Sequence, residues 1–145
     1  MPMEPPYDDD YPTCARTYAT LRIYHDDLDP NAITRILGIE PTRTQVKGRL
    51  CTSMTGRTFE PEIGGWFLST KHDVASKDVR RHLDWILDKL AGRDGAVRSL
   101  QDSGHRMDVF CYWHSAWGHG GPLLSPALMR RFGELGIEVG FDVYG

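Results

Sequence analysis

Hydrophobic and polar residues alternate along several short segments of the chain. In residues 17–25, Ala19, Leu21 and Ile23 would point to one side of a strand, and the residues between them to the other. This period of two predicts a β-strand with one buried face. The same reasoning predicts four more strands: residues 42–50, 64–72, 106–114 and 137–145.

Three other segments combine an apolar stripe with the residues that start and end helices. Each predicted helix runs between a capping side chain and a glycine: from Asp29 to Gly38, from Ser76 to Gly92, and from Ser125 to Gly136. The middle helix has the longest stripe, which includes Val79, Leu83 and Leu90. Its period of 3.6 residues predicts a helix packed on a core along one face.

These elements follow one another in the order β-α-β-β-α-β-α-β. Strands with one apolar face pack helices on that face only. The order therefore predicts a single α+β domain with a mainly antiparallel sheet and helices on one side. Its first part has the element order of a ferredoxin-like split β-α-β sandwich, to which a helix and a strand are added. We expect this domain to span residues 14–145.

The segment before the domain, residues 1–13, differs from it in composition. It contains four prolines and no basic residue, and its acidic residues are Glu4, Asp8, Asp9 and Asp10. Prolines keep a segment out of helices and sheet interiors, so the sequence predicts a flexible, solvated arm. An alternative is that the arm docks on a basic partner or folds back on a basic patch of its own domain.

Composition excludes several classes of function. The chain has a net charge of −3, and the arm holds four acidic residues and no base, so the domain is nearly neutral. A neutral domain argues against nucleic-acid binding, which needs many lysines and arginines. No apolar run has the length of a membrane span, so we expect no membrane partner. Cys14, Cys51 and Cys111 form no CxxC pair, which indicates a reducing compartment such as the cytoplasm.

No catalytic or cofactor motif is recognisable in the sequence. The segment 112–126 holds His114 and His119, but no further metal ligand lies nearby, and metal sites need several converging ligands. Its glycines lack the lysine and hydroxyl residue of a phosphate-binding P-loop. No GxSxG nucleophile motif is present. We therefore expect a protein that is not an enzyme and has no cofactor or metal.

Two groups of residues are candidates for binding. Arg43, Lys47 and Arg49 would share one face of the predicted strand 42–50. Their charge has two explanations that the sequence leaves open: it keeps an edge strand from pairing, or it forms a patch for an anionic group. The second group consists of aromatic residues expected at the surface, of the kind that dominate binding interfaces: Tyr24, Trp85 and Trp117.

Over about residues 17–144, the chain resembles the bacterial domain of unknown function 4279. The residues that carry the resemblance are Asp29-Pro30, Ile33-Thr34, Leu37-Gly38, Pro41-Thr42, Lys47-Gly48, Trp66 and Asp142-Tyr144. The resemblance implies a small α/β domain and transfers no activity or catalytic residue. Such families are similar in size to the cytoplasmic immunity proteins that neutralise secreted bacterial toxins.

Three hypotheses of function follow. The first is an immunity-type protein that occludes the active site of a toxin with its exposed aromatic residues, its basic strand, or the acidic residues Asp8, Asp9 and Asp10. The second is a module that binds a small anionic ligand with Arg43, Lys47 and Arg49 against Trp66. The third, which the sequence favours least, is a hydrolase or metal enzyme that uses His114 and His119.

Overall fold

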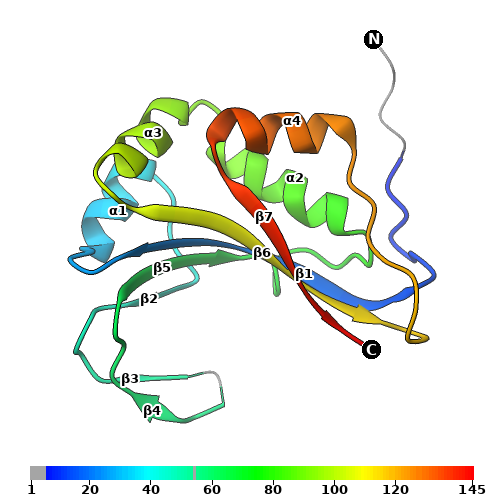
Figure 1. Cartoon of the computed structure of the whole chain (residues 1–145), viewed down its shortest axis with the longest axis horizontal. Coiled ribbons are helices and arrows are strands. Elements are labelled where there is room, and N and C mark those ends of the chain that lie inside the picture. The colour runs from blue at the N-terminus through cyan, green and yellow to red at the C-terminus, as the bar shows by residue number, and fades with distance from the viewer. Residues whose placement is uncertain (1–5, 54) are drawn as a thin grey trace.

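The computed structural model describes residues 6–53 and 55–145, and it consists of a five-stranded sheet, a small hairpin and four helices (Figure 1). The sheet contains β1 (Cys14–His25), β2 (Arg43–Gln45), β5 (Gly64–Ser69), β6 (Arg106–Ser115) and β7 (Glu138–Tyr144). The hairpin contains β3 (Cys51–Thr52) and β4 (Thr58–Phe59). The helices are α1 (Pro30–Leu37), α2 (Val79–Leu90), α3 (Asp94–Asp102) and α4 (Pro126–Leu135). None of these helices has the length and apolar character needed to cross a bilayer, as far as the described residues show.

The strands of the sheet lie in the order β2-β5-β1-β6-β7. All neighbours are antiparallel except β6 and β7, which α4 joins as a parallel pair. The unit β1-α1-β2 has β5 between its strands, and the unit from β5 to β6 has β1 between its strands. This interleaving is the split β-α-β arrangement. The predicted α+β domain with a mainly antiparallel sheet and helices on one face is thereby confirmed.

The core lies between the sheet and the helices. Ala19, Leu21 and Ile23 of β1 are inaccessible to solvent, as their alternation predicts. The predicted caps Asp29 and Ser125 both accept a backbone N–H at the start of their helices. The cap of α2 is Asp78 rather than the predicted Ser76, because the Asp78 carboxylate accepts the amide N–H of Arg80.

Two segments differ from the prediction. The segment 92–104, predicted as a turn, contains α3, whose apolar stripe is short because only Val97 and Leu100 are buried. The predicted strand 42–50 ends at Gln45. Beyond that point Gly48 has a positive φ of 74°, a backbone conformation that leaves the extended region, and the chain continues into the β3–β4 hairpin.

Candidate functional site

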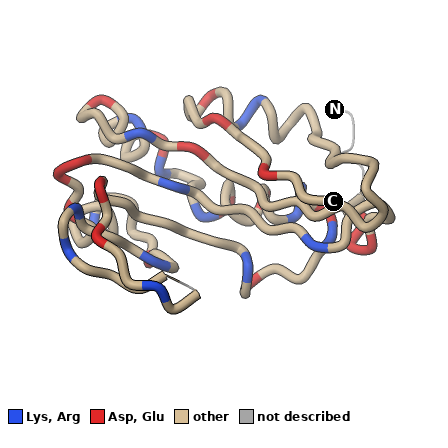
Figure 2. Tube along the Cα trace, turned by 60° about the horizontal axis from the view of Figure 1, so that its bottom comes forward, with Lys and Arg blue, Asp and Glu red and all other residues tan. Residues whose placement is uncertain are grey.

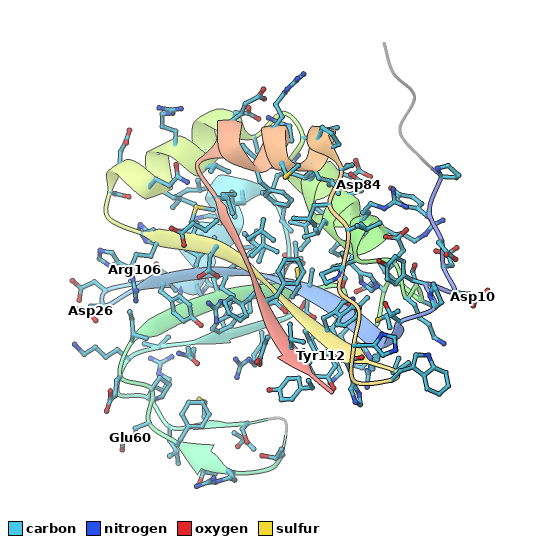
Figure 3. The ribbon with its side chains drawn as sticks, turned by 45° about the vertical axis from the view of Figure 1, so that its right-hand side comes forward. Asp10, Asp26, Glu60, Asp84, Arg106 and Tyr112 are labelled. Carbon is cyan, nitrogen blue, oxygen red and sulfur yellow. The ribbon has the colours of Figure 1, made fainter. Side chains whose placement is uncertain are left out.

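The sheet face opposite the helices is lined by aromatic and charged side chains around a shallow cavity of about 480 Å³. We call this surface the open face. Figure 3 labels Tyr112 on this side of the sheet, away from the helices. The residues of the open face are Tyr18, Thr20, Arg22, Tyr24, Thr42, Arg43, Phe67, Ser69, Lys71, Phe110, Tyr112, Asp142 and Tyr144.

Three tyrosines form a ladder across β1, β6 and β7. Tyr18 and Tyr112 are direct partners across the strands, and their rings stack with centroids 4.9 Å apart and planes 11° apart. The ring of Tyr144 lies 5.1 Å from that of Tyr112, tilted by 34°. Because stacked rings cover each other's faces, the ladder presents ring edges and hydroxyl groups to a ligand.

Arg22 lies at the centre of the open face and joins two strands. Its guanidinium donates two hydrogen bonds to the carboxylate of Asp108, at 2.7 and 2.8 Å, which raises the pKa of Arg22 above its usual value. The same guanidinium lies 4.4 Å from the ring centroid of Phe110 and 5.5 Å from that of Tyr24. These contacts hold a long, flexible side chain in one position.

Two glycines make room for the phenylalanine rings of the open face. A Cβ atom at Gly140 would lie 2.7 Å from the ring of Phe110, which is the direct cross-strand partner of this glycine. A Cβ atom at Gly65 would lie 2.5 Å from the ring of Phe67. Each ring therefore packs over bare backbone, a known way of covering a glycine in a sheet.

Two cations of the open face are available for a ligand. The Arg43 guanidinium lies 4.6 Å from the ring centroid of Phe67, and the Lys71 ammonium lies 5.3 Å from that of Tyr18. Neither forms an ion pair with a carboxylate within the described part of the chain. Figure 2 brings this side of the sheet forward and marks the charged positions along the trace.

The β3–β4 hairpin projects beyond the sheet on the side away from the helices (Figure 1). Leu50, the residue before β3, is an exposed apolar side chain with 64% of its surface accessible, and Arg49 next to it in the chain is exposed. Arg57, which precedes β4 at the turn end of the hairpin, is exposed as well. The hairpin thus places apolar and basic groups on the same side of the sheet as the open face. A large ligand on the open face would lie next to it.

The predicted anionic-ligand site is not assembled as expected. Arg43 lies on the open face, but Lys47 lies in a turn, where its ammonium is 3.7 Å from Asp26. Trp66 is fully buried on the helix side, and its indole N–H donates to the Thr34 hydroxyl at 3.1 Å. Neighbouring residues of a strand point to opposite faces, so Phe67 occupies the open face instead of Trp66. The prediction that Trp66 contacts a bound ligand is therefore wrong.

The predicted aromatic residues lie in three separate places. Tyr24 is on the open face, where its ring meets that of Phe67 edge-on at 5.5 Å. Trp85 is half-buried on α2, with the Lys89 ammonium 5.0 Å from its ring. Trp117 is 73% exposed in the loop after β6, and its indole N–H donates to the carbonyl of Pro12. They do not form one surface.

In the predicted arm, residues 6–9 lie against the stretch 76–81, and residues 11–13 lie against the loop after β6. Residues 1–5, with Glu4, fall outside the described residues. The Asp9 carboxylate accepts hydrogen bonds from Ser76, at 2.6 Å, and from Arg81, at 2.8 Å, and both lower its pKa. The Asp8 amide donates to Asp78. Asp10 points outward, away from Asp84 (Figure 3).

The segment 112–126, which holds His114 and His119, is not grouped with other described residues as a metal site. In the ranges that the structure describes, no three His, Cys, Asp or Glu side chains are grouped as metal ligands. His114 is exposed, and its ring meets that of Tyr112 edge-on at 6.4 Å. Its place beside the tyrosine ladder makes it a neighbour of the open face.

Sequence reasoning missed most of the open face. The missed residues include Tyr18, Arg22, Phe110, Tyr112 and Tyr144. The signal was present in the alternation of residues 17–25 and 106–114, whose outward positions hold aromatic side chains where a solvated sheet face usually has small polar ones.

A family model described as "Domain of unknown function (DUF4279)" matches residues 15–145, which is nearly the whole chain. The chain belongs to this family. No curated protein and no solved structure matches it significantly.

Proposed function

We propose that this member of the DUF4279 family is a non-enzymatic binding domain that takes a protein partner on the open face. The finer form of the proposal is an immunity-type protein that acts in the cytoplasm and neutralises a bacterial toxin by occluding its active site. The observation that carries the proposal is the set of aromatic and arginine side chains held in position on a sheet face that no described helix covers.

The residue types of the open face favour a protein interface. Tyrosine and arginine contribute a disproportionate share of the binding energy at such interfaces. Here Tyr18, Tyr112 and Arg22 are already held by stacking and by hydrogen bonds. A side chain that is ordered before binding loses little conformational entropy on binding, so more of the contact energy appears as affinity.

The acidic groups near the open face favour binding over acid–base catalysis. The Asp108 carboxylate accepts two hydrogen bonds from the guanidinium of Arg22, and the Asp142 carboxylate accepts one from the hydroxyl of Tyr144 at 2.8 Å. A general base needs a lone pair that faces the substrate. Both carboxylates instead serve to hold neighbouring side chains, which fits a preorganised interface.

Affinity purification with matched variants tests the proposal. The tagged chain, its Tyr112→Ala and Tyr144→Ala variants, and the control Met129→Ala, which changes an exposed side chain of α4, would be recovered from the native host. A partner identified by mass spectrometry would then be titrated against each purified protein by calorimetry. We expect the tyrosine variants to lose affinity and the control to keep it.

The toxin hypothesis makes a further prediction about the same partner. Expressed alone, the partner should arrest growth, and co-expression of the wild-type chain, but not of Tyr112→Ala, should restore it. A partner whose affinity is unchanged in both tyrosine variants would contradict the proposal. Thermal unfolding of each variant confirms that a lost interaction does not reflect an unfolded chain.

A small anionic ligand is the alternative, and the cavity favours it. A volume of about 480 Å³ is within the range of small-molecule sites, and Arg43 and Lys71 line it. Native mass spectrometry of the chain purified from its host would detect a bound species. Its loss in Arg43→Ala, with retention in Met129→Ala, would support this alternative.

A further inference from the structure

We infer that the protein partner presents an acidic polypeptide segment, whose carboxylates are held by Arg43 and Lys71 at one end of the open face. The inference rests on the proposal that the open face binds a protein partner. It goes further by naming the chemistry of the partner and the two side chains that recognise it.

Arg43 and Lys71 lie on the same side of the open face. Arg43 is in β2, next to β5 in the sheet, and Lys71 follows the end of β5; both line the same cavity. Each cation rests on an aromatic ring, Arg43 on Phe67 and Lys71 on Tyr18. These contacts place the charged ends of both side chains over the rings, and neither charge is paired with a carboxylate among the described residues.

The charges around the two residues leave an excess of positive charge. Of the charged residues that line the cavity, three are cations, Arg22, Arg43 and Lys71, and one, Asp142, is an anion. The carboxylate of Asp108 is paired with Arg22, and neither Asp108 nor Asp142 forms an ion pair with Arg43 or Lys71 in the described part of the chain. Arg16 and Arg106 add two more cations at the rim, at 5.7 Å from the Tyr18 ring centroid and 5.8 Å from that of Tyr24. Charge complementarity therefore selects an acidic partner.

The arrangement of the rings favours a polypeptide over a single-stranded nucleic acid. Proteins that bind single strands stack the bases on open faces of aromatic rings. On this sheet, one face of Tyr18 stacks on Tyr112 while Lys71 lies over the same ring, and Arg22 lies over Phe110. The rings leave edges and hydroxyl groups, which suit side chains and carboxylates.

A direct test titrates the isotope-labelled full chain with hexaglutamate and follows the backbone amide signals by NMR. We expect shifts centred on Arg43, Phe67 and Lys71, and weaker binding at higher salt. Arg43→Glu and Lys71→Glu should each weaken binding by about tenfold or more, as expected for a lost charged hydrogen bond. The control Arg98→Glu, an exposed arginine of α3, makes the same change of charge on the helix side and should leave the affinity within about twofold of wild type.

Three results would overturn the inference: shifts spread over the basic surface, an equal loss in Arg98→Glu, or equal or tighter binding of hexathymidylate at the open face. The native partner separates this inference from the proposed function. If Tyr112→Ala abolishes partner binding while Arg43→Glu and Lys71→Glu preserve it, the acidic-segment inference fails and the proposed function stands. If none of these variants alters partner binding, both fail.

Discussion

The ring of Phe110 occupies the space that a side chain at Gly140 would need. The two residues are direct partners in the parallel pair β6–β7, and a Cβ atom at Gly140 would lie 2.7 Å from the ring. The guanidinium of Arg22 lies 4.4 Å from the centroid of the same ring. The Phe110 ring is therefore held in place by the backbone of β7 at Gly140 and by the guanidinium of Arg22 on β1.

Gly140→Ala is expected to destabilise the fold, because the added methyl group must displace the Phe110 ring. We expect a loss of about 1–3 kcal/mol in the free energy of unfolding, the usual cost of an overpacked site. Chemical denaturation measures it. The control is Gly95→Ala in α3, where a Cβ atom meets nothing within 4 Å and helix propensity predicts a gain of up to about 1 kcal/mol. Equal stability of Gly140→Ala and wild type would contradict this packing.

The Arg22–Asp108 pair is expected to contribute more stability than an ordinary surface ion pair. Both side chains are about 70% buried, with accessible fractions of 29% and 28%, and the hydrogen bonds are bidentate. A double-mutant cycle with Arg22→Met and Asp108→Asn should give a coupling of about 1–2 kcal/mol.

The pair of Arg131 and Asp94 is the matched control for this cycle. It is also bidentate, but the side chain of Asp94 is 57% exposed. Its coupling should be below about 1 kcal/mol, as is usual for exposed pairs. If the two couplings were the same, burial and the neighbouring rings would add nothing to the Arg22–Asp108 interaction.

His82 is expected to make stability depend on pH. Its Nε2–H donates to the carbonyl of Ser76 at 2.8 Å, so Nδ1 accepts the hydroxyl of Thr70 at 2.6 Å, and the ring is neutral. Burial lowers its pKa in the folded state. The unfolded chain therefore binds more protons as the pH falls through the unfolded value of about 6.5, and stability decreases from there toward the folded pKa.

The measurement is the free energy of unfolding between roughly pH 7.5 and pH 5. His82→Gln should have a shallower decrease than wild type over this interval, whereas His72→Gln, which removes an exposed histidine, should keep the wild-type slope. His105 also has a lowered pKa because of burial, so some decrease remains in His82→Gln. Parallel curves for wild type and His82→Gln would rule out the role of His82.

Asp9→Asn is expected to loosen the contact between the arm and α2. Its carboxylate accepts from Arg81 and Ser76, and its backbone carbonyl accepts the amide of Lys77 at 2.9 Å. With the charge removed, the Lys77 and Asp8 amides should exchange with solvent faster in hydrogen-exchange measurements. Asp10→Asn, the same change one residue later, should leave both rates unaltered. Identical rates in the two variants would mean that the charge of Asp9 does not hold the arm.

Sequence by itself determined the features that depend on neighbouring residues. The ends of α1 are set by Asp29 and Gly38, and those of α4 by Ser125 and Gly136. The sequence predicts these ends because an N-capping side chain and a left-handed glycine act on backbone groups within one helical turn. The buried face of β1 followed from its alternation. These local signals were sufficient for the fold class and for the order of the elements apart from α3 and the β3–β4 hairpin.

Tertiary structure decided which residues meet. Tyr18, Tyr112 and Tyr144 lie far apart in the chain, and only the strand order β1-β6-β7 and its register bring them into one ladder. The same holds for Arg43 and Lys71, which share a cavity because β2 pairs with β5. A register shift of one residue would turn every side chain to the other face, and the register depends on all the strands together. The composition of the open face therefore required the assembled sheet.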